Sequence, residues 1–293
     1  MRNDADLRLA ASRNSSIYRR LRLSQARAFA ALFVYLGYPR MLHGVLKILR
    51  SAPIFRTLTG FSLAYRKTFR SFEEAQRTAC RYIEAGHEHE DDVRIHAALS
   101  LRIRESDYPV FYHWARMSPS PSRVFDLGGN IGNLFYAYQN YMKFPEGMRW
   151  TIYDIPPIRA AGQLIANQRN ESRILFVDSM EPAADCDLLL ASGCLHYFEQ
   201  PLHSLLGALP KLPRNVIANR MPVSEGPGIV TVQDNKTYLV PCKINNRSDF
   251  VKGMESIGYR LVEFWPVHEL ALHVPLYPES SSRTYSGFYF SLD

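Results

Sequence analysis

Short apolar runs alternate with helix-sized segments from about residue 120 onward. The runs at 124–126, 150–154, 174–179, 187–193 and 215–219 have the length and composition of buried strands. Helical patterning fills 133–141, 159–170 and 198–209 between them. Strands that alternate with helices predict an α/β fold with a mainly parallel sheet.

The last part of the chain departs from this alternation. Residues 223–242 read as a loop with two short β-rich runs, and a helix at about 248–257 ends at Gly258. The segments 259–265 and 287–292 read as two final strands that pair antiparallel. The sequence therefore predicts a seven-stranded sheet in which five or more strands are parallel.

The first 120 residues carry helical patterns. We expect residues 1–16 to be frayed, two or three helices over 17–70, and further helix over 71–120, with Ser71 as an N-cap. A Pro119-Ser-Pro121 linker precedes the sheet, which begins at Arg123. The predicted organisation is a basic helical N-terminal segment (1–70), a helical cap or lid (71–120) and a sheet domain (121–293).

A glycine-rich turn follows the first strand, where residues 124–132 read VFDLGGNIG. Glycine has no Cβ, so a ligand can approach the backbone of such a turn closely, and the following helix start offers free N–H groups. The order D-x-G-G-x-x-G resembles the first motif of class I S-adenosylmethionine-dependent methyltransferases. The alternative interpretation is a glycine turn in another kind of α/β protein.

Three successive strands end in an acidic residue: Asp126, Asp154 and Asp178. Ligands of open parallel sheets bind outside the carboxyl ends of the strands, so these carboxylates are expected to surround one crevice. The resemblance implies that Asp154 binds the ribose hydroxyls and that Asp178 lies near the adenine amino group. The expected cofactor-binding residues are Asp126, Gly128, Gly129, Asn130, Gly132, Asp154, Asp178, Ser179, Ser192, Gly193 and, as part of a lid, Tyr108.

Residues 70–293 also resemble a bacterial methyltransferase family associated with surface-polysaccharide or secondary-metabolite gene sets. The segments that carry this resemblance are 104–111, the glycine turn, 189–197, 219–222, 232–233 and 238–241. The resemblance implies a Rossmann-like methyltransferase fold behind a helical cap. In that family an acid usually precedes the arginine after the fifth strand, and here the position is Asn219.

The acceptor is expected between the end of the fourth strand and the loop after the fifth. His196 is the natural general base near neutral pH, with Tyr197 beside it, although packing is an alternative role. Arg220 could bind an acceptor carboxylate or phosphate, or form a salt bridge with Glu225. His113, Glu225 and Gln233 complete the expected acceptor-binding residues.

Positive charge is concentrated at the N-terminal end of the chain. Residues 1–70 hold 14 of the 35 Lys and Arg residues and 2 of the 28 acidic residues, whereas the other 223 residues carry a net charge of −5. We expect this segment to associate with an anionic membrane surface or an acidic partner, to contribute to a homodimer, or to pack on the sheet domain. No basic–aromatic nucleic-acid motif is present, so a nucleic-acid partner is not expected.

We expect a cytoplasmic protein, because the four cysteines are scattered, the chain begins without a signal-peptide pattern, and its apolar runs are too short to span a bilayer. Peripheral association with a membrane is the alternative. The ligand-rich run at 87–92 reads as a solvated turn, and the spacing of His268 and His273 does not fit a zinc helix, so no metal is expected.

The predicted function is methylation, with S-adenosylmethionine as cofactor, of an oxygen or nitrogen in a small metabolite or glycan unit. The alternatives are an NAD-dependent oxidoreductase, whose G-x-G-x-x-G pattern is missing, and a non-catalytic binding protein on a methyltransferase fold.

Overall fold

The computed structural model describes residues 64–82, 101–234, 239–271, 281 and 284–292. The basic segment at 1–63, the ligand-rich run at 87–92 and His273 lie outside the described residues, so the expectations for them stay predictions.

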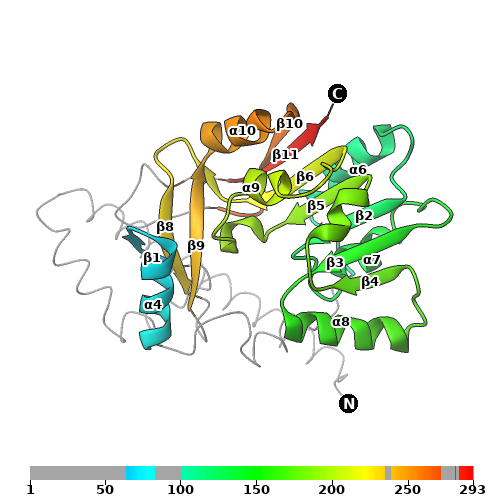
Figure 1. The fold of residues 1–293 in the computed structure, drawn as a ribbon, viewed down its shortest axis with the longest axis horizontal. Coiled ribbons are helices and arrows are strands. Elements are labelled where there is room, and N and C mark those ends of the chain that lie inside the picture. Colours follow the sequence, from blue (N-terminus) through cyan, green and yellow to red (C-terminus); the bar gives the residue numbers. More distant parts are fainter. Residues whose placement is uncertain (1–63, 83–100, 235–238, 272–280, 282–283, 293) are drawn as a thin grey trace, which may run out of the picture.

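A seven-stranded sheet forms the centre of the described part (Figure 1). Its strand order is β10-β11-β6-β5-β2-β3-β4. Strands β6, β5, β2, β3 and β4 pair in parallel, and β11 pairs antiparallel with both β6 and β10. The bounds are β2 Arg123–Leu127, β3 Arg149–Tyr153, β4 Ile174–Val177, β5 Leu188–Ser192, β6 Asn215–Met221, β10 Arg260–Val267 and β11 Tyr285–Ser291. This confirms the predicted Rossmann-like fold with five parallel strands and a final antiparallel pair.

Helices cover both faces of this sheet. Successive residues of a strand point to opposite faces, so the apolar strands supply side chains to a helix layer on each side. On one face, Val124, Leu188 and Ile217 pack with helices α6 (Asp107–Arg116), α7 (Asn133–Tyr138) and α8 (Pro156–Gln168). On the other face, Phe125 and Leu189 pack with α9 (Leu202–Gly207) and α10 (Arg247–Ser256). The short 3₁₀ turns η2 (Glu181–Asp185) and η3 (Leu195–Tyr197) flank β5.

Helix ends follow from local sequence. Two prolines occupy the start of α8, where their missing N–H groups cost nothing. The side chain of Asn246 accepts a hydrogen bond from the N–H of Asp249 and caps α10, which ends before Gly258 at φ 100°.

An aromatic cluster lies between α6, α7 and the first two parallel strands. Trp150 is fully buried, and its ring lies 5.9 Å from that of Trp114 and 5.7 Å from that of Phe135. Such ring pairs are worth about 0.5–1.5 kcal/mol each beyond the area they bury. The indole N–H of Trp150 donates to Asp126 Oδ2 at 3.0 Å, so the cluster fixes a carboxylate at the end of β2.

A second, four-stranded sheet stands beside the first, with the order β1-β8-β9-β7 (Figure 1, left). Its strands are β1 Ala64–Phe69, β8 Ile229–Asp234, β9 Leu239–Asn246 and β7 Val223–Ser224, and helix α4 (Phe72–Tyr82) packs on β8 and β9. The predicted helix over residues 64–69 is therefore wrong. The N-cap is confirmed, because Ser71 Oγ accepts from the N–H of Glu74 at 3.1 Å.

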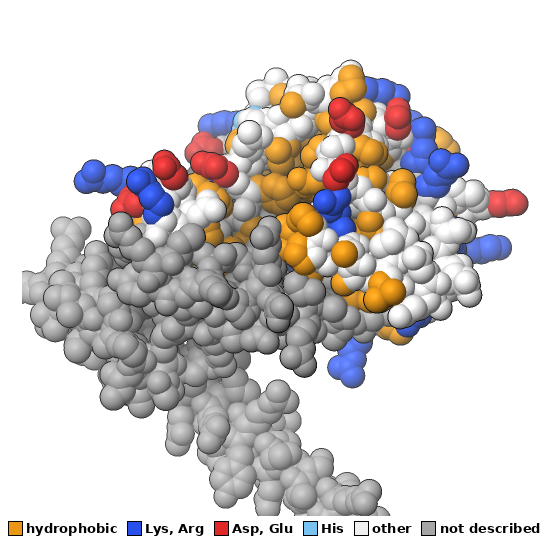
Figure 2. All heavy atoms as spheres, turned by 60° about the horizontal axis from the view of Figure 1, so that its bottom comes forward, with side chains coloured by type: hydrophobic (Ala, Val, Ile, Leu, Met, Phe, Trp, Pro, Cys, Tyr) orange, Lys and Arg blue, Asp and Glu red, His pale blue; other side chains and the backbone are white. Residues whose placement is uncertain are grey.

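Large apolar side chains reach the surface of the described part at several places. Figure 2 shows hydrophobic side chains gathered on one face with charged side chains around them. By their exposed surface area, the large hydrophobic side chains at the surface include Leu164 on α8 and Leu175 on β4. Among the described residues, the helices are all too short or too polar to cross a membrane. The homodimer and the membrane association stay predictions.

Candidate functional site

The glycine turn after β2 requires glycine at two positions for different reasons. Gly128 has φ 65°, and a Cβ there would lie 2.4 Å from the Cβ of Cys194 in the loop after β5. A Cβ on Gly129 would lie 2.5 Å from Asp126 Cγ. Gly132 has φ 95° and immediately precedes α7. The sequence predicted a tight glycine turn between a strand and a helix, and the structure adds that this turn packs closely against Cys194 after β5.

Asp126 lies beneath this turn and is 1 % exposed. Its Oδ2 accepts from Trp150, while Oδ1 has no hydrogen-bond partner among the described residues. Burial raises the pKa of this carboxyl to about 7, and the nearby charge of Asp154 adds to the increase. A cation placed here would favour the ionised form of Asp126.

Asp154 directly follows β3 and is half-buried. Its Oδ2 accepts from the backbone N–H of Asn130 at 2.8 Å, and its Oδ1 accepts from that of Ile155 at 2.8 Å. Asn130 is in the left-handed region at φ 55°, so Asp154 holds the glycine turn in shape. Each carboxylate oxygen has a second lone pair that can accept a hydroxyl hydrogen.

The other expected cofactor residues lie around the same edge of the sheet. Asp178 is exposed and follows β4, two strands from β2, with Ser179 half-buried beside it. Ser192 ends β5, and Gly193 follows with φ 75°. Tyr108 on α6 is 61 % exposed and packs edge-on against Phe111. The cofactor roles of these residues stay predictions.

Arg220 lies at the end of β6 in a buried polar network, and it has φ 55°. Its Nη2 lies 2.6 Å from Asp107 Oδ2, its Nε donates to Ser106 Oγ at 2.9 Å, and its Nη1 donates to Ser192 Oγ at 2.9 Å. Arg220 and Asp107 are 8 % and 1 % exposed. The guanidinium therefore joins helix α6 to the ends of β5 and β6.

The salt bridge considered between Arg220 and Glu225 is wrong. Glu225 is exposed and lies 2.8 Å from Arg247 at the start of α10. The left-handed backbone at Arg220 interrupts the alternation of side chains between the two faces of β6 and turns the Arg220 side chain toward Asp107 on α6. Nothing in the local sequence indicated this pair.

Asn219 uses its side-chain amide both as a hydrogen-bond donor and as an acceptor. It is 2 % exposed, its Nδ2 donates to the carbonyl oxygen of Ser106 at 3.0 Å, and its Oδ1 accepts from the N–H of Arg220 at 3.0 Å and from Trp265 Nε1 at 3.3 Å. A carboxylate accepts but does not donate, so it could not satisfy the Ser106 carbonyl.

His196 and Tyr197 lie in η3, between the two sheets. His196 is 3 % exposed, and its ring centroid is 3.9 Å from that of Tyr197 and 6.4 Å from that of Tyr285. The hydroxyl of Tyr197 donates to Gln233 Oε1 on β8 at 2.6 Å. The structure thus brings together three of the expected acceptor-side residues, although their chemical roles stay predictions.

His113 lies elsewhere, on the side of α6 that faces β10 and β11. It is 5 % exposed, with its ring 5.7 Å from that of Trp265 and 4.7 Å from that of Tyr289. Burial lowers its pKa, and the nearby carboxylate of Glu263 partly opposes this. The rings around His113 are those of Trp265 and Tyr289, whereas His196 lies beside Tyr197 and Tyr285, so the two histidines have different surroundings.

Several residues of the site were missed by the sequence analysis. They are Ser106, Glu269, Tyr138, Trp150 and Cys194. Glu269 accepts from Ser106 Oγ, and Tyr138 donates to Asp107 Oδ1 at 2.7 Å. Ser106 and Cys194 lie in segments that carry the family resemblance, but no local pattern marks any of the five as a site residue, and only long-range packing brings them together. Within the described ranges, His, Cys, Asp and Glu form no group of three or more that could hold a metal ion.

Comparison with known proteins gives structural similarity alone. No protein-family model matches the chain, and no curated protein matches it. The chain resembles the crystal structure of the 1,6-didemethyltoxoflavin-N1-methyltransferase of Burkholderia thailandensis with bound 1,6-didemethyltoxoflavin and S-adenosylhomocysteine. The TM-score is 0.48 and the identity 19 %, over 79 % of this chain and 95 % of that one.

Two further similar structures are O-methyltransferases. The mitomycin 7-O-methyltransferase MmcR has a TM-score of 0.45 and 15 % identity, over 88 % of this chain and 68 % of its own. NcsB1, from neocarzinostatin biosynthesis, was crystallised with S-adenosylhomocysteine and 1,4-dihydroxy-2-naphthoic acid. Its TM-score is 0.44 and its identity 15 %, over 89 % of this chain and 69 % of its own. At these values the fold assignment stands on the strand order of this chain's own sheet: it has the Rossmann-like fold of class I methyltransferases.

Proposed function

We propose that this protein is an S-adenosylmethionine-dependent methyltransferase acting on an oxygen or nitrogen of a small metabolite or glycan unit. The observation that carries the proposal is the pair of neighbouring carboxylates, Asp126 and Asp154, at a glycine turn on the carboxyl edge of a parallel sheet. Ligands of such sheets bind at this edge.

The charge of this edge discriminates between the candidate cofactors. S-adenosylmethionine carries a positive sulfonium and a positive ammonium group, and Asp126 Oδ1 is a buried acceptor without a hydrogen-bond partner among the described residues. The pyrophosphate of NAD would bring negative charge toward Asp126 and Asp154, which already repel each other. The residues present therefore fit S-adenosylmethionine better than a dinucleotide.

The rest of the fit concerns hydrogen bonds and space. We assign the ribose hydroxyls to the carboxylate of Asp154, which also holds Asn130 in place. Gly128 and Gly129 let the turn pack directly against Cys194 and Asp126, since a Cβ at either position would clash with one of these side chains. When bound, S-adenosylmethionine supplies an electrophilic methyl group.

The protein's own part in the reaction is to orient the acceptor and to accept a proton. Correct positioning of two reactants can contribute about 7–11 kcal/mol to lowering a barrier. We assign the proton acceptor to His196, whose ring is fixed against Tyr197, which in turn is anchored to Gln233 on the second sheet. Proton transfer by a positioned base contributes about 10²–10⁴-fold.

Arg220 is assigned to the framework of the crevice. Its three nitrogens are already bound to Asp107, Ser106 and Ser192. An acceptor carboxylate or phosphate would have to displace a buried partner, so the acceptor is best described as a hydroxyl- or amine-bearing molecule without a required negative charge.

The test is release of S-adenosylhomocysteine from S-adenosylmethionine during a screen of sugars, amino acids and small aromatic alcohols and amines. With an authentic acceptor, His196→Ala should lower turnover by about 10²–10⁴-fold and leave cofactor affinity unchanged. His203→Ala, a half-buried histidine on α9, is the matched control and should turn over normally. Normal turnover by His196→Ala would remove the base assignment and leave positioning alone.

A further inference from the structure

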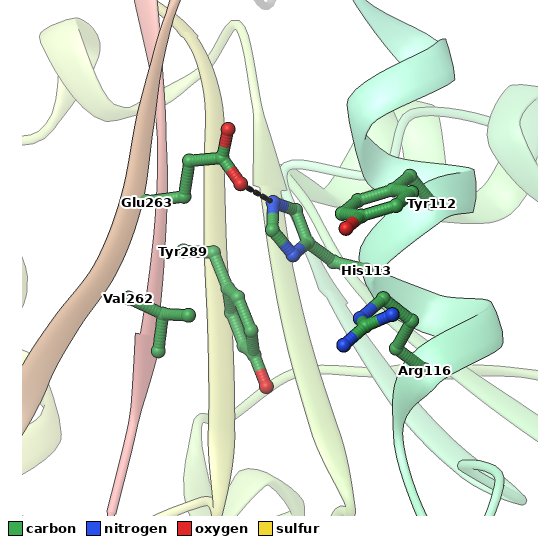
Figure 3. Close-up of a pocket in the computed structure, with 6 residues that line it drawn as sticks. All are labelled: Tyr112, His113, Arg116, Val262, Glu263 and Tyr289. Atoms are coloured by element: carbon green, nitrogen blue, oxygen red, sulfur yellow. Dashed lines mark ion pairs between the residues drawn. The ribbon is translucent and has the colours of Figure 1, made fainter.

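A separate pocket of about 320 Å³ opens between helix α6 and strands β10 and β11 (Figure 3). Its walls are Tyr112, His113 and Arg116 from α6, Val262 and Glu263 from β10, and Tyr289 from β11. This volume lies at the lower end of the range for small-molecule sites.

The pocket is distinct from the proposed cofactor site at the glycine turn. In the sheet order, β6 and β5 separate β11 from β2, which corresponds to about 14 Å across the sheet. Along α6, Arg116 follows Asp107 by nine residues, about 13 Å along the helix axis. A ligand in this pocket would therefore not contact the proposed cofactor or acceptor positions.

Two opposite charges stand on different walls of the pocket. Figure 3 shows Arg116 projecting from α6 toward Tyr289, and Glu263 reaching from β10 toward His113. The Arg116 guanidinium carbon lies 5.4 Å from the centre of the Tyr112 ring. Within the described part of the chain, Arg116 has no carboxylate within 4.0 Å and Glu263 has no Lys or Arg nitrogen within that distance. Both charges are thus available to a ligand.

His113 does not neutralise Glu263 near pH 7. Its Nε2 lies 3.1 Å from Glu263 Oε2, but the geometry is not that of a hydrogen bond. Burial lowers the pKa of His113, Glu263 raises it, and Arg116 lowers it further, with the net effect downward. A mainly uncharged imidazole leaves the negative charge of Glu263 uncompensated.

The remaining walls are apolar or aromatic. Tyr112 is 55 % exposed, Val262 is 38 % exposed, and the Tyr289 ring packs 4.7 Å from that of His113. The pocket therefore offers a guanidinium for a carboxylate, a carboxylate for an ammonium group, and apolar surface for a side chain. We propose that it binds a free α-amino acid with an apolar or aromatic side chain, its carboxylate on Arg116 and its ammonium group on Glu263.

The experiment uses three probes with the same ring: L-phenylalanine, phenethylamine, which lacks the carboxylate, and 3-phenylpropanoate, which lacks the amine. Affinities are measured by ligand-observed NMR titration of the full chain. Wild-type protein should bind phenylalanine at least about tenfold more tightly than either truncated probe.

The variants assign each charge. Arg116→Ala should bring phenylalanine down to the affinity of phenethylamine, and Glu263→Gln should bring it down to that of 3-phenylpropanoate. Arg149→Ala and Glu146→Gln, exposed residues at and just before β3, are the matched controls and should bind like wild type. Titration of S-adenosylhomocysteine should give equal affinities for all five proteins, which separates this proposal from the proposed function.

Three outcomes would overturn the proposal. The first is no saturable binding of phenylalanine at millimolar concentration. The second is equal affinity for phenylalanine and a truncated probe in the wild type. The third is unchanged phenylalanine binding by Arg116→Ala and Glu263→Gln.

Discussion

The two sides of the proposed site, one for the cofactor and one for the acceptor, are built from the chain in different ways. On the cofactor side, the residues from Asp126 to Gly132 form one continuous turn, joined by Asp154 at the end of the next strand. On the acceptor side, Arg220 bonds to Ser106, 114 positions earlier in the sequence, and Tyr197 bonds to Gln233 on the second sheet. The first side is specified by a local motif, whereas the second depends on how distant elements pack.

The largest effect is expected from breaking the buried pair on the acceptor side. Arg220→Met leaves Asp107 buried without its counter-ion, and such losses cost about 3–5 kcal/mol. Arg247→Met, which removes the exposed pair with Glu225, should cost at most about 1 kcal/mol. Urea unfolding of both variants measures the difference, and equal destabilisation would show that the buried network is not what joins α6 to the sheet.

On the cofactor side, a single methyl group should be enough to disrupt the turn. Gly128→Ala places a Cβ 2.4 Å from Cys194 Cβ, and overpacking of this kind costs about 1–3 kcal/mol beyond the backbone strain. Gly147→Ala is the matched control, because Gly147 has φ 73° but nothing within 4 Å of its Cβ position. The difference in unfolding free energy between Gly128→Ala and Gly147→Ala measures the cost of the contact with Cys194. Equal destabilisation by the two substitutions would contradict the close packing of this turn.

A change of one atom tests why an amide stands at position 219. Asn219→Asp removes the donor to the Ser106 carbonyl, and an unsatisfied buried polar group costs about 1–3 kcal/mol. Asn215→Asp serves as a comparison at the half-buried start of β6, where the Asn215 amide donates to the carbonyl oxygen of Asp187. Thermal unfolding at neutral pH should place Asn219→Asp below wild type, and an unchanged or raised Tm would show that position 219 accepts a carboxylate.

The stability of the folded protein should also depend on pH through Asp126. Its pKa is raised in the folded protein from 3.8 to about 7, so its contribution to stability is complete below pH 3.8 and is lost as the pH rises to about 7. Wild type should therefore lose stability relative to Asp126→Asn between about pH 4 and 7. Urea unfolding at several pH values measures this, with Asp178→Asn, an exposed carboxylate, as the control that follows wild type. A constant difference between wild type and Asp126→Asn would contradict the raised pKa.

The large sheet was predictable from the sequence because its strands and helices alternate, and the apolar pattern of each lies within one short segment of the chain. It failed at 64–69, where a helix was predicted, because β1 is held as a strand by pairing with β8, about 165 positions away. The glycine turn and Asp154 were predictable for the same reason that the sheet was: each lies where a strand ends. The partners of Arg220 were not, since the left-handed backbone at that residue and the position of α6 follow from tertiary packing.

The glycine turn and Asp154 are proposed to bind S-adenosylmethionine. Isothermal titration calorimetry with S-adenosylmethionine, S-adenosylhomocysteine and NAD tests it directly in wild type and in Asp154→Ala. We expect binding of the first two ligands and none of NAD, with a loss of about 1.5–3 kcal/mol of binding free energy in Asp154→Ala. Because Asp154 also holds Asn130, the variant's fold is checked by circular dichroism. Tight binding of NAD alone, or no binding of any of the three, would contradict the claim.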